Sequence, residues 1–468
     1  MSLWIRWWHL VKQMRPACAR LRTFLWLATC LAGMTVRKDL LGVTSIIRAL
    51  GLKEFCYDRI LDFYHSPGLN LEKLTRIWKS IIVGCPLVLK TNGRLLLVGD
   101  GLKVPKEGKK MPAVKKLHQE SQSNTKPAYI FGHYCQAIAM LAGALQSVFA
   151  VPLASRIHDG VVFSNRDTRT ALDKMLQLLM SLDIREPFYF IADAYYASKK
   201  MAFDLIAQHN HLITRVKSNA VAYTPVETTT NAHKRRRGRP KEYGKKVKLR
   251  DYFKEGAERQ TCPSPVYGDR NVNIQFKTAD LLWRPVGIVT RFVWVFHPVR
   301  GRIILMSTDP ALSALNIIRL YGLRFKIEVS FKQALHILGT YAYHFWMKVL
   351  NPIRKNLGNQ YLHRKSNDYR DAVRRKLAAY HNHIQIGIIA QGILQYLSLC
   401  FPKQVWASFG SWIRTIRPRL CPSERVTAIA LCNSFPEFLS GSFKNSILLK
   451  FLIKYIDLDR AEGVRLVV

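Results

Sequence analysis

The stretch Arg94-Leu-Leu-Leu-Val-Gly-Asp-Gly-Leu-Lys-Val-Pro105 places a single carboxylate, Asp100, in the middle of an apolar run. Four hydrophobic residues lead into Gly99, and a run of this kind is typical of a buried strand. An ionised carboxylate inside a sheet is costly unless a cation compensates it. The stretch therefore predicts one of two structures. Either it is a strand whose Asp100 serves a metal, an arginine or a site, or it is an Asp-Gly hairpin turn.

The charge balance indicates the kind of partner. The chain has 468 residues with 72 Lys and Arg against 31 Asp and Glu, a net charge of +41. A hydrophobic content of 49% is enough for packed cores, which excludes a disordered polycation and leaves room for two or three domains. The excess of positive charge predicts a polyanionic partner, with nucleic acid favoured over an anionic membrane surface.

Cysteine usage and apolar runs bear on the compartment. The nine cysteines form no Cys-x-x-Cys pair and no zinc-type cluster, so we expect reduced thiols in a cytosolic protein. Leu21–Val36 is too short to cross a bilayer. Ile384–Phe401 carries three glutamines, so we expect it to be a buried helix and expect no membrane partner.

A second carboxylate follows another apolar strand. Phe188-Tyr-Phe-Ile-Ala leads directly into Asp193, much as the first run leads into Asp100. The surrounding patterns alternate between strands and helices, which predicts a mixed α/β sheet. The other strands are expected at Tyr129–Leu141, Ser147–Ile157 and His211–Lys217, and the helices at Asn165–Leu182 and Ser198–His209. Two buried strands that each end on an aspartate favour a functional pair over two structural coincidences.

The chain divides into three regions that differ in predicted secondary structure. Residues 1–92 show helical spacing on a basic background and predict a DNA-binding region, for which a helix-turn-helix is the candidate type. Residues 93–350 hold the mixed sheet, with a β-rich basic insertion at 220–305. Residues 351–468 are again helical, and either DNA-end contact or dimerisation fits them.

The insertion contains the run His233-Lys-Arg-Arg-Arg-Gly-Arg-Pro-Lys241. Its Arg-Gly-Arg-Pro core resembles an AT-hook, which reads the narrow minor groove of A·T tracts. A run of like charge also fits simple phosphate contact or a solvated loop, and all three interpretations remain open. The candidate DNA-binding residues of this run are Arg235, Arg236, Arg237 and Arg239.

A third carboxylate lies in Tyr321-Gly-Leu-Arg-Phe-Lys-Ile-Glu-Val-Ser-Phe-Lys332. Tyr321, Arg324, Glu328 and Lys332 are three or four residues apart, so they are predicted to line one face of a continuous helix. An exposed salt-bridge ladder on an ordinary amphipathic helix would show the same spacing.

Taken together, these motifs resemble those of the DDE transposases of bacterial insertion sequences. Asp100 in Leu-Val-Gly-Asp-Gly, Asp193 in Phe-Ile-Ala-Asp-Ala and Glu328 in Tyr-x2-Arg-x3-Glu are similar to the acidic triad of the cut-and-paste subgroup. The spacings are 93 and 135 residues, and the long second gap is similar to members with a β-rich insertion. The family's lysine falls seven residues after the glutamate, where this chain has Leu335, while Lys332 lies four residues after it.

The resemblance implies a ribonuclease-H-like α/β fold and a two-metal reaction on DNA. Two Mg²⁺ (or Mn²⁺) ions would stabilise the attacking and leaving oxygens of a phosphodiester. Carboxylates suffice as ligands for such hard cations. By resemblance, Asp100 would bridge both ions, Asp193 and Glu328 would each hold one, and Tyr321, Arg324 and Lys332 would contact phosphates. The implied partners are double-stranded DNA, namely element ends with inverted repeats and target DNA, and a second copy of the chain in the DNA complex.

The same residues are also compatible with two other functions. One is a structure-specific nuclease or resolvase that cleaves DNA without joining ends, and the other is a catalytically inactive DNA-binding relative. Outside the triad, His133 is expected to be a hydrogen-bonded structural histidine rather than a catalytic helper. Trp346 is expected to pack in a core, although stacking on a flipped base is the alternative.

Overall fold

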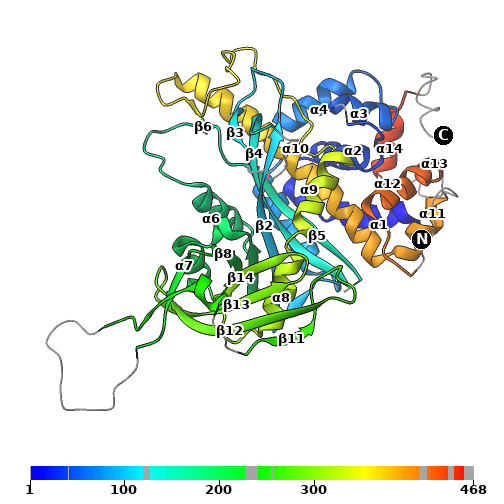
Figure 1. Ribbon diagram of the computed structural model, residues 1–468. Coiled ribbons are helices and arrows are strands. Elements are labelled where there is room, and N and C mark those ends of the chain that lie inside the picture. Colours follow the sequence, from blue (N-terminus) through cyan, green and yellow to red (C-terminus); the bar gives the residue numbers. More distant parts are fainter. Residues whose placement is uncertain are drawn as a thin grey trace, which may run out of the picture. The chain divides into compact units, whose positions relative to one another are not determined.

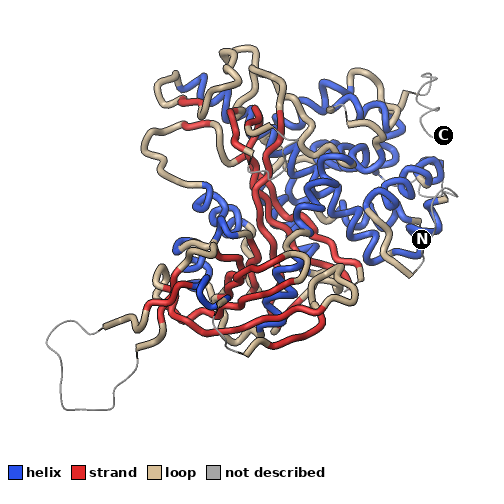
Figure 2. The backbone as a smooth tube through the Cα atoms, in the orientation of Figure 1, coloured by secondary structure: helices blue, strands red, loops and turns tan. Residues whose placement is uncertain are grey.

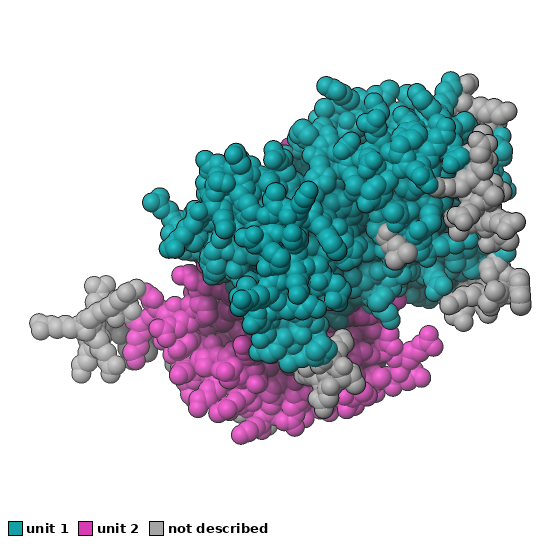
Figure 3. Space-filling model, turned by 90° about the horizontal axis from the view of Figure 1, so that it is seen from above, with its two compact units in different colours: residues 1–89, 101–183, 327–468 teal, residues 90–100, 184–326 magenta. Residues whose placement is uncertain are grey.

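The computed structural model describes residues 2–40, 42–119, 127–144, 146–226, 241–254, 258–410, 419–440 and 447–457. The chain forms two compact units, coloured separately in Figure 3. Unit 1 comprises residues 1–89, 101–183 and 327–468, and unit 2 comprises residues 90–100 and 184–326. Each unit is therefore built from segments that are far apart in the sequence.

Unit 1 contains most of the helices, drawn in blue in Figure 2. The N-terminal segment is helical as predicted, with α1 (Leu3–Lys12), α2 (Leu21–Val36), α3 (Val43–Ala49), α4 (Cys56–His65) and α5 (Leu71–Val83). The remaining helices are α6 (Ala171–Ser181), α9 (Lys326–His336), α10 (Asn367–Cys400), α11 (Pro402–Phe409), α12 (Glu424–Asn433), α13 (Phe435–Ser440) and α14 (Ile447–Tyr455).

Helix α10 is the centre of unit 1, and α1, α2, α4, α5 and α12 pack around it (Figure 1). By length and composition this helix is long and apolar enough to cross a membrane, but 89% of its most apolar 18-residue stretch is buried inside the structure. A helix that is apolar all round is expected in a protein core. The predicted buried helix at Ile384–Phe401 is thus confirmed within α10.

The three glutamines of α10 are buried and hydrogen-bonded. The side-chain amide of Gln385 donates to Leu153 O at 2.9 Å, and that of Gln391 donates to Ser330 O at 3.0 Å. The amide of Gln395 donates to the Glu424 carboxylate at 2.9 Å. Buried amides need such partners, so these residues dictate which segments lie against α10.

The two ends of the chain pack together within unit 1. The Trp4 indole donates to Leu431 O at 2.9 Å, and its ring centroid lies 5.1 Å from that of Phe435. Trp26 makes a similar contact with Phe451, at 5.1 Å. Large aromatic side chains bury much apolar area, so the N-terminal and C-terminal helices share one core.

The strands of unit 1 form a smaller antiparallel group. They are β3 (Lys115–His118), β4 (Tyr129–Ala144), β5 (Ser147–Ile157), and the last residues of β2 (Arg94–Pro105). β3 pairs with the first residues of β4, and β5 pairs with the rest of that strand. β5 also packs on α10. A short parallel pair joins β6 (Val161–Val162) and β15 (Gln360–Tyr361).

Unit 2 is a mixed α/β sheet in the order β10-β9-β12-β13-β14-β8-β7-β2. β2 is parallel to β7 and β7 is parallel to β8, while the other neighbours are antiparallel. The strands not yet given are β1 (Lys90–Thr91), β7 (Phe188–Ala192), β8 (His211–Val216), β9 (Val221–Tyr223), β10 (Lys246–Lys248), β11 (Gln260–Pro263), β12 (Asn273–Trp283), β13 (Ile288–His297) and β14 (Gly301–Ser307). The helices are α7 (Lys199–Ala207) and α8 (Ala314–Leu323).

The stretch around Asp100 is a continuous strand. β2 runs from Arg94 to Pro105 without interruption, which excludes the alternative of an Asp-Gly hairpin turn. Residues 95–98 are all buried, as expected for a strand covered on both faces. Asp100 is therefore a carboxylate within a sheet, and it needs compensation.

Gly132 of β4 offers a test of this packing within unit 1. A Cβ at this position would overlap the Val104 carbonyl oxygen. Because backbone cannot retreat as a side chain can, Gly132→Ala should destabilise unit 1 by about 1–3 kcal/mol. Gly84→Ala is the control, since its Cβ would meet only ordinary contacts. Urea unfolding measures both, and equal midpoints for the two variants would contradict the prediction.

Candidate functional site

The strand register of unit 2 brings two carboxylates side by side. β2 and β7 are parallel with Val98 opposite Ile191, and Asp100 and Asp193 each lie two residues further along. Residues in register on neighbouring strands point to the same face, and such strands lie about 5 Å apart. The two aspartates predicted from their separate strands therefore share one face and one edge of the sheet.

Asp100 is compensated by an arginine. The Arg324 guanidinium Nη1 donates to Asp100 Oδ2 at 3.0 Å, and both side chains are 19% exposed. At this partial burial, a charge-assisted bond offsets much of the cost of removing the carboxylate from water. The sequence offered a metal, an arginine or a site as the compensating feature, and the structure shows the arginine.

Asp193 is held by the turn that follows β7. Its Oδ1 accepts a hydrogen bond from Tyr195 N at 3.1 Å, which caps the short 3₁₀ helix Ala194–Tyr196. The buried hydroxyl of Thr214, on β8, donates to the Asp193 carbonyl oxygen at 2.7 Å. Both contacts restrict the backbone at Asp193, so its carboxylate projects from a defined position.

The predicted continuous helix through Tyr321 and Lys332 is wrong. α8 ends at Leu323 and α9 begins at Lys326, with a turn at residues 324–325. The Arg324 amide donates to Tyr321 O at 3.0 Å, three residues back, which tightens the last turn of α8. Beyond it, the ring of Tyr267 packs against Phe325, and the Lys326 ammonium lies 3.7 Å from the Tyr267 ring centroid.

Tyr321 lies close enough to Asp193 to interact with its charge. Burial raises the pKa of its phenol above the ordinary value, the charges of Arg324 and Arg215 lower it, and that of Asp193 raises it. These three groups are thus near the phenol. A tyrosine with a raised pKa stays protonated at neutral pH and retains an O–H donor.

Arg215 is a site residue that the sequence reasoning missed. Ala192 pairs with Thr214 between the parallel strands β7 and β8, so Arg215 is in register with Asp193. Asp100, Asp193 and Arg215 form a row across three neighbouring strands, and Arg215 is exposed. The available signal was weak, namely a lone charge inside the apolar pattern of His211–Val216.

Glu328 and Lys332 belong to unit 1, on α9. Both side chains are exposed and four residues apart, whereas Ile327 and Phe331 are buried. Glu328 is in the first turn of α9, where the helix dipole favours a negative charge. The amphipathic character predicted for this stretch is confirmed locally.

Two of the three predicted metal ligands, Asp100 and Asp193, lie on one face of the sheet. Among the residues that the structure describes, no three His, Cys, Asp or Glu side chains form a group arranged to hold a metal ion. Asp100 and Asp193 offer carboxylate oxygens on one face, the donor type that Mg²⁺ and Mn²⁺ prefer. The Arg324 guanidinium beside Asp100 shows that this face accommodates positive charge.

The other predicted residues have different outcomes. Arg235, Arg236, Arg237 and Arg239 lie outside the described residues. His133 is buried and its Nε2 lies 2.9 Å from Pro112 O, which confirms a structural role. The core packing expected for Trp346 is wrong, because Trp346 is 65% exposed. Its neighbours Phe345 and Met347 are buried instead, as alternation along an extended chain requires.

Comparisons with known proteins give a family for part of the chain. Residues 145–340 match the family model described as the transposase DDE domain. No curated protein has a sequence that matches the chain. Among solved structures, the chain is similar to the piggyBac transposase in a synaptic complex with hairpin DNA. The sequence identity is 13% and the TM-score is 0.35, over 94% of this chain and 78% of that chain.

Thr214 provides a test of how Asp193 is positioned. Thr214→Val keeps the shape but leaves the Asp193 carbonyl without this donor, which should cost about 1–3 kcal/mol. Thr214→Ser retains the hydroxyl and should cost less. Amide hydrogen exchange over residues 188–196 and urea unfolding measure the effect. Equal exchange and stability in the two variants would show that the bond does not hold Asp193.

Proposed function

We propose that this chain is a DNA transposase, because its residues 145–340 match the family model described as the transposase DDE domain. In this proposal it cleaves DNA at the ends of an insertion sequence and joins them to target DNA in a two-metal reaction. The observation that carries the proposal is the row of Asp100, Asp193 and Arg215 on one face of the sheet, with Arg324 beside it.

We propose a ribonuclease-H-like core for the catalytic region. The parallel strands β2, β7 and β8, with antiparallel strands continuing the sheet beyond β8, support this assignment. In such a core, Asp100, Asp193 and Glu328 would hold Mg²⁺ or Mn²⁺. When bound, the ions would stabilise charge on the attacking and leaving oxygens of the phosphodiester.

The remaining side chains have roles that follow from their chemistry. Arg324 has donors beyond the one used on Asp100 and suits bidentate phosphate contact. The protonated Tyr321 donates a hydrogen bond to a phosphate oxygen, and Arg215 and Lys332 supply further positive charge. Together these cations offset the repulsion between two carboxylates and the DNA backbone. The net charge of +41 supports DNA as the partner.

The decisive test is Asp100→Asn. The amide has nearly the same shape but no charge, so strand cleavage should be lost while DNA affinity is retained. The assay uses Mg²⁺ or Mn²⁺ and DNA carrying the inverted repeats expected beside the gene. Cleavage by the variant would remove Asp100 from the mechanism.

Two results with the wild-type protein would favour the rival functions. Cleavage of branched DNA without strand transfer would indicate a nuclease or resolvase. DNA binding with neither cleavage nor Mn²⁺ binding would indicate an inactive relative.

Arg215 should contribute to DNA binding. Arg215→Gln is expected to weaken binding and to reduce the slope of log K against log salt by about 0.9, the value for one phosphate contact. Arg185→Gln is the matched control, because Arg185 is exposed in the same unit but precedes the opposite end of β7. An unchanged slope in Arg215→Gln, or an equal change in the control, would contradict this role.

A further inference from the structure

Residues 346–365 of unit 1, which lie between α9 and α10, expose several large apolar side chains. Apart from the two-residue strand β15, this segment has no helix or strand. Trp346 is 65% exposed and Tyr361 is 63% exposed, and Val349 and Leu357 are exposed as well. Single apolar residues at a surface are ordinary, whereas several in one short segment indicate an interaction site.

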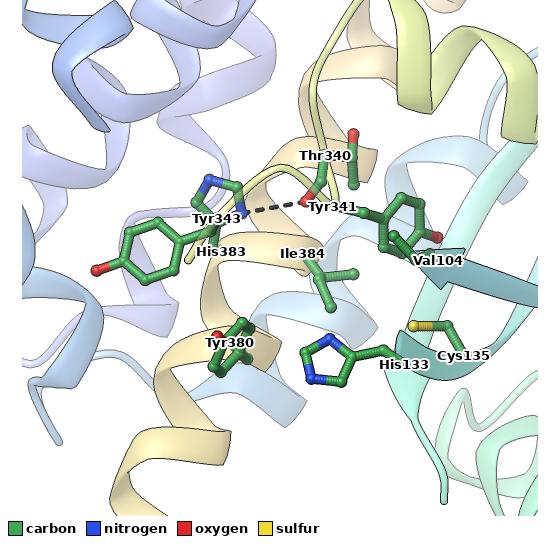
Figure 4. Close-up of a pocket in the computed structure, with 9 residues that line it drawn as sticks. All are labelled: Val104, His133, Cys135, Thr340, Tyr341, Tyr343, Tyr380, His383 and Ile384. Carbon is green, nitrogen blue, oxygen red and sulfur yellow. Dashed lines mark hydrogen bonds between the residues drawn. The ribbon is translucent and has the colours of Figure 1, made fainter. Parts of the chain in front are cut away.

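The chain that leads into this segment is fixed in the core of unit 1. Lys106 Nζ donates to Tyr341 O and, at 3.2 Å, to Tyr343 O. A ring nitrogen of His383, on α10, lies 3.1 Å from Thr340 O (Figure 4). Buried backbone carbonyls need such partners, so the 346–365 segment starts from a defined point.

Backbone hydrogen bonds hold the segment itself against two other parts of unit 1. The Met347 amide donates to Lys110 O, between β2 and β3, at 2.9 Å. The Leu362 amide donates to Val162 O on β6 at 2.8 Å, beside the parallel pairing of β15 with β6. The segment is therefore an ordered part of the surface although most of it is irregular (Figure 1).

Buried side chains of the segment determine which of their neighbours face the solvent. They pack in one hydrophobic cluster, together with Phe131 of β4 and Val373 of α10. Trp346 and Tyr361 directly precede members of this cluster, so both rings are held at the surface beside the same small core. The members that the segment contributes are Met347, Leu350, Ile353 and Leu362.

The charge of the segment is entirely positive. Residues 346–365 contain five Lys and Arg and no Asp or Glu. Within the described part of the chain, only Lys355 of these five forms an ion pair, with Glu107 at 3.4 Å, and both side chains are exposed. Such a surface pair contributes little. The exposed cations are Lys348, Arg354, Lys355, Arg364 and Lys365.

This composition favours a nucleic acid over a protein as the partner. Lysine is depleted in protein–protein interfaces, whereas uncompensated Lys and Arg attract polyanions. Aromatic rings among cations are typical of surfaces that bind single strands, because a ring can stack on a base only where the base is unpaired.

We propose that the 346–365 segment binds unpaired nucleotides of DNA. Trp346 and Tyr361 stack on bases, and the surrounding cations contact phosphates. The inference rests on the proposed function only for the choice of DNA as the nucleic acid. It requires no metal ion, and every residue that it uses belongs to unit 1.

The experiment measures the binding of the full chain to two probes by fluorescence anisotropy in the absence of divalent metal. One probe is a single-stranded oligothymidine, and the other is a DNA duplex of the same length. Trp346→Ala removes a ring and Trp346→Phe retains one. Phe55→Ala is the control, because Phe55 is an exposed aromatic residue of the same unit within a stretch, residues 53–62, that carries more carboxylates than cations.

Trp346→Ala should weaken oligothymidine binding about tenfold and leave duplex binding nearly unchanged, since stacking on one base is lost. Trp346→Phe should recover most of the affinity, and Phe55→Ala should match the wild type. Lys348→Gln should reduce the slope of log K against log salt for oligothymidine by about 0.7, the value for one phosphate contact. Because these side chains are exposed, thermal unfolding midpoints should not change.

The failures of the two proposals are distinguishable. A wild-type protein that binds neither probe would refute the proposed function and this inference together. A wild type that binds both probes but does not cleave DNA would refute the proposed function and leave this inference standing.

Other outcomes would overturn this inference alone. One is a Trp346→Ala variant that keeps its oligothymidine affinity or loses affinity equally for both probes. Another is a wild-type dimer, seen in sedimentation velocity, that dissociates in Trp346→Ala while oligothymidine affinity is unchanged. That result would assign the exposed rings to contact with a second copy of the chain.

Discussion

A carboxylate in the middle of a sheet must be compensated, and in this protein the Asp100–Arg324 pair meets that requirement. The pair also ties the end of α8 to β2. Gly99 has a matching role, because a Cβ at that position would overlap the ring of Phe190 on β7. The glycine leaves room for the Phe190 ring beside the charge. The local sequence Gly-Asp-Gly therefore serves packing and electrostatics at once.

The parallel register of β2, β7 and β8 places other charged residues beside Asp100. Because the strands run the same way, the residues that follow their buried runs lie at one edge, as in other sheets with parallel strands. Asp100, Asp193 and Arg215 meet there although they come from distant segments. The two carboxylates are neighbours in this row, and positive charge lies beside each of them, Arg324 at Asp100 and Arg215 at Asp193. This arrangement suits a polyanionic substrate that must approach two carboxylates.

In unit 1, irregular and helical segments are buried among apolar side chains, and their buried polar atoms need hydrogen-bond partners. Long polar side chains provide them, each reaching a backbone acceptor or a carboxylate. The glutamines of α10 belong to this set, as do Arg37 and Lys106. Such groups specify which segments lie together, since an unpaired buried polar atom is costly.

Local patterns in the sequence determined most of the elements and the two aspartates of the sheet. β2, β7 and α7 lie almost where their apolar periods place them, because burial on one or both faces is determined by neighbouring residues. The helix break at Arg324 was not predictable in this way, since helical spacing continues across it and the packing of Tyr267 is a distant contact. Arg215 and Lys106 likewise gain their importance from neighbours that are far away in the chain. Only tertiary structure decided these points, because the distance between two strands in a sheet is independent of their separation in sequence.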